Sequence, residues 1–204
     1  MIAVTGGIGS GKSTVLAAIR EKGYYALSCD EIARELYAEY GVCRKLKKLF
    51  PEAVVGRIFP RADKKKLSEM VFNDKSALTK LNSFMHPLIM SEVSKRAEKS
   101  GEKMVFVEVP LLFECSLQDS FDKVLILMRD DDERIKSVMS RSSLTHKEVL
   151  DRMNNQTDYV KLDKSAYTVI VNDGTENQLK QKAEEFCKQT EKQFLLTKTG
   201  DAGQ

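Results

Sequence analysis

The sequence predicts an α/β fold in which a parallel sheet of about five strands is covered by helices on both faces. First, short apolar runs alternate along the chain with stretches that have helical spacing. Second, these runs show little alternation between apolar and polar residues, as expected for strands that are buried on both faces. Third, a glycine-rich segment lies between the first apolar run and the first helical stretch, where sheets of this class bind ligands.

Five apolar runs of five or six residues predict the strands. They are residues 1–5, 24–28, 104–109, 123–128 and 167–171. Apolar residues at intervals of three and four predict helices between and after these runs. The helices are expected at residues 13–22, 32–50, 67–71, 76–96 and 176–193.

Glycine and proline predict where the regular elements stop. Gly23 ends the first helix, and we expect interruptions near Gly41 in the second helix and at Pro87 in the fourth. Residues 51–66 contain two prolines and a glycine before a run of lysines, so we expect this segment to be a loop.

Two polar segments are longer than the crossovers of a parallel sheet require. We therefore expect one domain over the whole chain, with its core at about 1–30, 101–129 and 167–195. Residues 31–100 are expected to form a helical substrate-binding insertion, and residues 130–166 a helical lid.

Composition excludes several classes of protein. The net charge of +3 is too small to indicate a nucleic-acid partner. The cysteines at positions 29, 43, 115 and 187 form no CxxC pair, which argues against a zinc site or disulfides and fits a reducing cytosol. No apolar run approaches the ~20 residues that span a bilayer, and the N-terminus lacks a signal-peptide pattern. We expect a cytoplasmic protein without membrane association, either a monomer or a weak homo-oligomer.

The glycine-rich segment matches the P-loop motif G-x-x-x-x-G-K-[ST] in its strand-to-helix context, which predicts a P-loop NTPase core. Its glycines allow backbone N–H groups to point at phosphate oxygens, and the start of the next helix adds a favourable dipole. Lys12 is expected to reach the β- and γ-phosphates, and the Ser13 hydroxyl to bind Mg²⁺. The alternative is a glycine-rich turn that binds nothing. The expected ATP-binding residues of this segment are Gly7, Ile8, Gly9, Ser10, Gly11, Lys12, Ser13 and Thr14.

The rest of the chain favours transfer of the phosphate to an acceptor rather than to water. There is no guanine-reading N-K-x-D motif, and the chain has no room for motor or partner domains. Asp30 follows the second strand, where ligands of open α/β sheets bind. A carboxylate there can take the proton of an acceptor hydroxyl that attacks the γ-phosphate. Alternatively, Asp30 caps a helix that starts at Glu31.

Charged residues elsewhere fit the same chemistry. Arginines of a lid would neutralise charge on the transferred group and exclude water, although each could instead belong to a solvated helix face. Glu108, at the end of the third strand, could hold Mg²⁺ through water or be a simple polar residue. The arginines in or beside the lid segment are Arg129, Arg134, Arg141 and Arg152.

In this order the motifs resemble the dephospho-CoA kinase family, which phosphorylates the ribose 3′-hydroxyl of dephospho-CoA with ATP. The likeness covers nearly the whole chain, and HP followed by PLLFE is its specific part. The resemblance implies a nucleotide-binding core, a mostly helical CoA domain, a lid, and the final step of coenzyme A synthesis. The motifs are TGGIGSGKST at 5–14, CDEIAR at 29–34, VF-D at 71–74, HP at 86–87, VPLLFE at 109–114, R---Q at 152–156 and VIVNDG at 169–174.

The resemblance also implies roles for single residues. It makes Asp30 the general base, Arg141 the lid arginine over the phosphates, and Asn172 a residue near the adenine of ATP. Together with Lys12, Asp30 and Arg141 are the expected catalytic residues. The residues implied to bind the acceptor are Asp30, Arg34, Lys64, His86, Pro87, Pro110, Leu111, Leu112, Phe113 and Glu114.

From the residues alone, other interpretations stay open. His86 and Pro87 could form a structural turn, and the Leu-Leu-Phe run could be core, a surface for adenine and pantetheine, or a mixture. Two positions depart from the family pattern. Ser28 stands where the family usually has the first Asp of D-x-D, and Lys64 replaces an Arg, which keeps the charge but loses the bidentate fork. The remaining alternatives for function are a kinase for another small acceptor, such as a nucleotide or a sugar, and a non-catalytic ATP-binding regulatory module.

Overall fold

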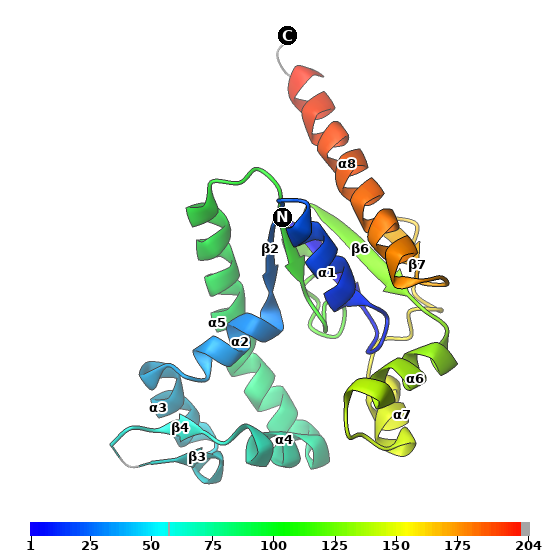
Figure 1. Ribbon diagram of the computed structural model, residues 1–204. Helices are drawn as coiled ribbons and strands as arrows, with labels where there is room; N and C mark the ends of the chain where they lie inside the picture. The colour runs from blue at the N-terminus through cyan, green and yellow to red at the C-terminus, as the bar shows by residue number, and fades with distance from the viewer. Residues whose placement is uncertain (57, 201–204) are drawn as a thin grey trace. The chain divides into compact units, whose positions relative to one another are not determined.

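The computed structural model describes residues 1–56 and 58–200, except for the side chains of residues 72, 73 and 197–200 (Figure 1). Phe72 of the VF-D stretch therefore lies outside the described side chains. The chain divides into two compact units. Unit 1 comprises Met1–Leu27 and Gly101–Gln204, and unit 2 comprises Ser28–Ser100.

Unit 1 is built on a five-stranded sheet in the order β2-β5-β1-β6-β7. The strand β1 pairs in parallel with β5 and β6, and β6 pairs in parallel with β7. The predicted fold class, a parallel sheet of about five strands, is confirmed, and each strand lies within a residue or two of its predicted position. The strands are β1 (Ile2–Gly6), β2 (Tyr25–Ser28), β5 (Val105–Glu108), β6 (Lys123–Met128) and β7 (Thr168–Val171).

The central strand β1 is buried along its whole length. Since successive side chains of a strand point to opposite faces of the sheet, both faces of β1 are covered. Ile2 and Val4 belong to the hydrophobic core that the sheet forms with α1 (Lys12–Glu21) and α8 (Glu176–Gly200). These two helices lie side by side on one face of the sheet in Figure 1. Ala3, which points to the other face, is also fully buried. A P-loop that continues from β1 is thus held by the most buried strand of the sheet.

The segment after β6 forms two capped helices, α6 (Asp131–Arg141) and α7 (His146–Asn154). Asp130 caps α6 by accepting hydrogen bonds from two backbone N–H groups, and Thr145 begins α7 with a capping box. The helices pack together through Ile135, Val138 and Val149, with the Ile8 side chain of the P-loop against the same cluster. The expected helical character of 130–166 ends at Asn154, and turns follow.

Unit 2 is mostly helical, and it confirms one prediction and corrects another. The interruption predicted near Gly41 in the helix over 32–50 is confirmed, but it lies at residues 37–39, and Gly41 itself is inside the second helix. The loop predicted over 51–66 is wrong, since it holds a 3-10 turn, a short antiparallel hairpin and the start of a helix. Asp63 starts that helix early, because its carboxylate accepts from the backbone N–H of Lys66 at 3.0 Å. The elements are α2 (Cys29–Leu36), α3 (Tyr40–Leu49), η1 (Pro51–Ala53), β3 (Val54–Val55), β4 (Arg61–Ala62), α4 (Lys64–Asn73) and α5 (Lys75–Ser100).

The predicted interruption at Pro87 is also wrong, because α5 continues through this residue. Proline removes one helical hydrogen bond, the one to the carbonyl four residues earlier. Here that carbonyl belongs to Ser83, and both Ser83 and Pro87 are exposed, so water can satisfy it. Buried residues on either side of the proline, such as Met85 and Val93, keep both halves of the helix packed.

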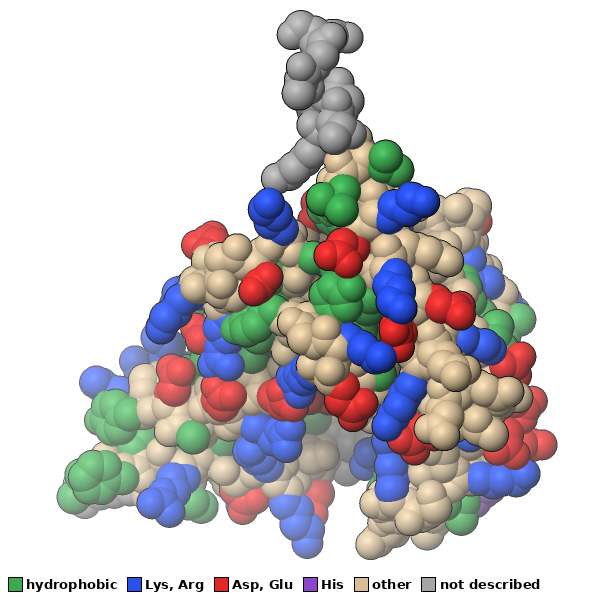
Figure 2. Space-filling model, turned by 45° about the horizontal axis from the view of Figure 1, so that its top comes forward, with side chains coloured by type: hydrophobic (Ala, Val, Ile, Leu, Met, Phe, Trp, Pro, Cys, Tyr) green, Lys and Arg blue, Asp and Glu red, His purple; other side chains and the backbone are tan. Residues whose placement is uncertain are grey.

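The surface is mixed in charge. On the face shown in Figure 2, Lys and Arg side chains are interspersed with Asp and Glu, without a continuous field of one sign. Among the described residues, no helix combines the length and the apolar character needed to cross a membrane.

Candidate active site

The P-loop joins β1 to α1, as its motif requires. Gly9 and Gly11 have φ angles of 78° and 104°, in the left-handed region that favours glycine. The ammonium group of Lys12 turns back into the loop and donates to the carbonyl oxygens of Gly6 and Gly7 at 2.7 and 3.0 Å. The lysine is thereby positioned inside the loop, where a phosphate group would be bound.

Close packing is a second reason for glycine in the loop. A Cβ at Gly7 would lie 2.2 Å from a terminal nitrogen of Arg134, and a Cβ at Gly9 would lie 2.6 Å from the Arg134 carbonyl oxygen. A Cβ at Gly11 would lie 2.8 Å from the side-chain amide nitrogen of Asn172. The loop is thus covered by α6 and by the segment after β7.

Side chains from three segments contact the P-loop backbone. Arg134 of α6 donates from Nε to the carbonyl oxygen of Ile8 at 2.9 Å, and Gln156 accepts from the Ile8 N–H at 2.7 Å. Asn172 donates from Nδ2 to the carbonyl oxygen of Ser10 at 3.0 Å. The predicted residue Asn172 therefore does lie at the loop.

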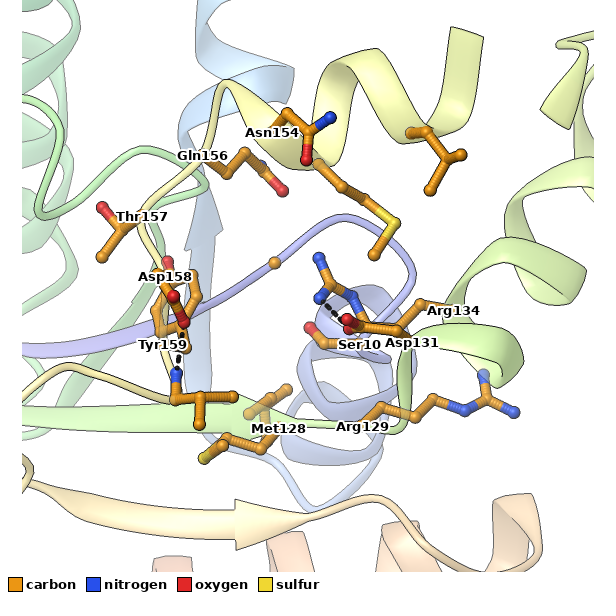
Figure 3. Close-up of a pocket in the computed structure, with 15 residues that line it drawn as sticks. Ser10, Met128, Arg129, Asp131, Arg134, Asn154, Gln156, Thr157, Asp158 and Tyr159 are labelled. Carbon is orange, nitrogen blue, oxygen red and sulfur yellow. Dashed lines mark hydrogen bonds and ion pairs between the residues drawn. The ribbon is translucent and has the colours of Figure 1, made fainter. Parts of the chain in front are cut away.

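A cavity of about 350 Å³ lies beside the P-loop, bounded by the end of β6, α7 and residues 156–160. Its charged wall includes Arg129, Asp131 and Arg134, and Arg134 pairs with Asp131 at 2.7 Å (Figure 3). Ser10 also lines it, and the buried Ser10 hydroxyl has no hydrogen-bond partner among the described residues. Buried polar groups are normally satisfied, so this hydroxyl is available to a ligand of the loop.

The segment after α7 is tied to the base of the P-loop through Tyr159. The Thr5 hydroxyl, on β1, donates to the Val109 carbonyl at 2.8 Å and lies 3.2 Å from the Tyr159 hydroxyl. Burial raises the pKa of Tyr159 to about 12, so this hydroxyl stays protonated at neutral pH.

The PLLFE segment supports the same region. Leu112 is completely buried, which favours a packing role for this side chain. Phe113 packs edge-on against the rings of Tyr159 and Tyr167, with centroids 5.9 and 5.3 Å away. The Glu114 carboxylate accepts from the Thr157 N–H at 2.7 Å. Pro110 and Leu111 are half-buried.

The other predicted residues of unit 1 lie at the ends of elements. Ser13 is exposed and Thr14 half-buried in the first turn of α1, and Glu108 is the last residue of β5, in register with Val4 of β1. Arg141 is exposed in the last turn of α6 and is not among the residues that line the cavity.

For the acceptor-side residues of unit 2, the structure excludes two of the alternative interpretations. Asp30 lies exposed in the first turn of α2, whose N-cap is Ser28, so Asp30 is not the capping residue. His86 and Pro87 lie within α5, so they do not form a turn. Burial lowers the pKa of His86.

Two basic residues predicted to bind the acceptor, Arg34 and Lys64, are exposed in unit 2. Arg34 donates from Nε to the Asp30 carbonyl oxygen at 3.3 Å. Lys64 begins α4 with its ammonium nitrogen 5.9 Å from the centre of the Tyr37 ring.

Sequence reasoning missed part of the site. The sequence does not distinguish Arg134 from the other lid arginines, and Gln156 stands out only as the last residue of the R---Q stretch. Tyr159 had no local signal at all, because its partner Thr5 is 154 residues away in the chain.

Among the described residues, no three His, Cys, Asp or Glu side chains gather into a potential metal site. A divalent metal could still bind with a triphosphate, because Mg²⁺ is usually held by one or two protein oxygens together with phosphate and water. Ser13 and Glu108 are hard oxygen donors of this kind, so the residues present fit such a metal.

Comparisons with known proteins agree on one family. Residues 1–178 match the family model described as dephospho-CoA kinase. A Thermus thermophilus protein named dephospho-CoA kinase is 37% identical over 175 residues, which cover 86% of this chain and 84% of that protein. A crystal structure from T. thermophilus superposes with a TM-score of 0.80 at 35% identity, covering 92% of this chain and 96% of the other. A dephospho-CoA kinase structure from Campylobacter jejuni gives a TM-score of 0.69 at 26% identity, covering 94% and 96%.

Proposed function

The chain belongs to the dephospho-CoA kinase family, and from this premise we propose how its own residues carry out the reaction. The activity is ATP-dependent phosphorylation of dephospho-CoA, the last step of coenzyme A synthesis. The observation that carries the proposal is the P-loop at the β1–α1 junction, in a chain that matches the family over residues 1–178.

On the ATP side, backbone N–H groups of the P-loop other than that of Ile8 bind the phosphates, with the dipole of α1 behind them. Lys12 leaves the carbonyls of Gly6 and Gly7 and pairs with the β- and γ-phosphates. Asn172 lies near the adenine, and Arg141 neutralises charge on the transferred phosphoryl group when the lid, residues 130–166, is closed.

The family acts on ATP with a divalent metal, and we propose Mg²⁺ at this site. The cation would supply charge neutralisation between the β- and γ-phosphates. Ser13 would hold it directly and Glu108 through water.

On the acceptor side, unit 2 binds dephospho-CoA. Asp30 takes the proton of the 3′-hydroxyl, since it is an exposed carboxylate two residues after the end of β2. Arg34, Lys64 and His86 recognise the charged and polar groups of the acceptor. We propose that Pro87, Pro110, Leu111 and Phe113 offer apolar surface to the acceptor and that Glu114 offers it a polar group. Leu112 is completely buried and supports this segment from the core.

We further propose that the protein is cytoplasmic and acts as a monomer or weak homo-oligomer, without a nucleic-acid or membrane partner. The scattered, unclustered cysteines and the mixed surface charge support this.

An acceptor screen tests the function. Coupled assays with ATP and dephospho-CoA, AMP, CMP or gluconate should give turnover on dephospho-CoA far above the other three. Equal turnover on all acceptors would reject the assignment, and ATP hydrolysis that no acceptor stimulates would indicate a regulatory module instead.

A further inference from the structure

The peptide groups of Ile8 are held from two directions by side chains. Its N–H donates to Oε1 of Gln156 at 2.7 Å, and its carbonyl oxygen accepts from Nε of Arg134 at 2.9 Å. Gln156 comes from the segment after α7 and Arg134 from α6 (Figure 3). Both main-chain groups of this one loop residue are thus bonded to side chains from the segment 130–166.

We propose that Arg134 and Gln156 are positioning residues for catalysis, which fix the tip of the P-loop at Ile8 in the orientation that binds phosphate. An N–H that donates to Gln156 is not available to a phosphate, so Ile8 serves the geometry of the loop rather than the ligand. This inference rests on the proposed function, because it assumes that the loop binds ATP.

The two side chains are themselves anchored. The side chain of Arg134 is only 15% exposed, pairs with Asp131 at 2.7 Å and lies so close to Gly7 that a Cβ there would be 2.2 Å from a terminal guanidinium nitrogen. Gln156 is followed at once by Thr157, whose N–H is bonded to Glu114 at 2.7 Å. These contacts restrict the Arg134 donor and the segment that carries the Gln156 acceptor before ATP binds, as preorganised binding requires.

The side chain of Ile8 adds a third contact with the same elements, since it packs on the cluster of Ile135, Val138 and Val149. The peptide and side chain of one loop residue thus connect the P-loop to both α6 and α7. A change in the position of these helices would be passed to the loop through Ile8.

Amide hydrogen exchange measured by NMR tests the contact without ATP. Gln156→Met keeps the length of the side chain but removes the acceptor, so exchange at the Ile8 N–H should become at least about 10-fold faster. The Val15 N–H, which donates to Gly11 within the start of α1, should be unchanged. If Ile8 exchange stays at the wild-type rate in a folded variant, the inference is wrong.

Affinity for ATP, measured by calorimetry, and kcat with dephospho-CoA test the consequence. Gln156→Met should raise the Kd for ATP about 3- to 10-fold, and Arg134→Met about 10- to 100-fold, as expected for loss of a neutral and a charged hydrogen bond. The double variant should lose less than the product of the two factors, because both side chains hold the same residue, Ile8, through its two adjoining peptide groups. Strictly multiplicative losses would contradict a shared role.

Lys136→Met is the matched control, since Lys136 also lies on α6 but is 72% exposed and bonded to Glu133. Its ATP affinity and kcat should remain within about 2-fold of wild type, and a loss equal to that of Arg134→Met would reject the inference.

If Gln156→Met does not fold, Gln156→Glu provides a second test. It retains an acceptor and should keep the Ile8 N–H protected, so fast exchange of this N–H would also reject the inference. If the wild-type protein does not bind ATP, the proposed function is wrong. The exchange rates of the Ile8 N–H would still show whether its hydrogen bond to Gln156 exists.

Discussion

Gly9→Ala separates the two reasons for glycine in the P-loop. The backbone of Gly9 has a φ of 78°, and a left-handed conformation costs an alanine about 1–2 kcal/mol. The added Cβ would also lie 2.6 Å from the carbonyl oxygen of Arg134, which is backbone and cannot rotate away. Displacing α6 adds a cost of about 1–3 kcal/mol, typical of overpacking. We therefore expect a total loss of about 2–5 kcal/mol in the free energy of unfolding.

Two other glycines provide matched controls. Gly23 has a φ of 85°, but an added Cβ would meet nothing within 4 Å, so Gly23→Ala should lose only the backbone cost of about 1–2 kcal/mol. Gly41 lies in α3 with neither a positive φ nor a close neighbour, so Gly41→Ala should be neutral or stabilising by up to about 1 kcal/mol.

Urea unfolding of the three variants, with ATP binding by calorimetry, gives the comparison. Only Gly9→Ala should lose ATP affinity, because only there must the loop and α6 move apart. The reasoning is refuted if Gly9→Ala matches Gly23→Ala in both stability and ATP affinity.

Three further predictions concern the proposed roles. Lys12→Ala should weaken ATP binding and abolish transfer, a loss of about 2–4 kcal/mol in the transition state; wild-type rates in the kinase assay would contradict this. Asp30→Asn should lower kcat about 10²- to 10⁴-fold with ATP affinity nearly unchanged, because the amide cannot take a proton; retention of more than about a tenth of kcat would remove Asp30 from that role. Burial lowers the pKa of His86, so the folded state binds its proton less tightly than the unfolded state, and this histidine contributes stability above about pH 6.5 that is lost as the pH falls through its folded pKa. In urea unfolding, His86→Gln should therefore lose less stability than wild type when the pH falls from 7.5 to about 5. Equal losses in the two proteins would show that His86 does not have a lowered pKa in the folded state.

The sheet could be predicted because its strands are short, continuous apolar runs. Residues 123–128 match β6 without error, since each of the four central residues is buried and apolar. Pro87 shows the limit of local rules. A proline predicts a break, but burial of Met85 and Val93 on either side outweighs one lost hydrogen bond.

The phosphate-binding loop could be predicted from the sequence because the P-loop motif is local. The side chains that support the loop could not be predicted, since Arg134 and Gln156 bond the carbonyl and the N–H of Ile8, which lies 126 and 148 residues earlier in the chain. Every residue has a main-chain N–H or carbonyl, so a side chain that bonds to one leaves no characteristic residue type at the partner position in the sequence. The hairpin at 54–62 was missed for a related reason, because strands of two residues have no pattern that distinguishes them from a loop.

The place of β1 in the sheet has a consequence for synthesis on the ribosome. It is the central strand and the first to be made, but Ile2 pairs with Phe106 and Lys123, and β2 lies beyond β5. At about 5–20 residues per second, β1 waits roughly 6–25 s for its second neighbour. Unit 2, a continuous segment that ends at Ser100, is complete before then. Slow translation between residues 101 and 128 would lengthen the time in which the apolar strand β1 lacks one or both of its neighbours, and with it the exposure of the nascent chain to aggregation.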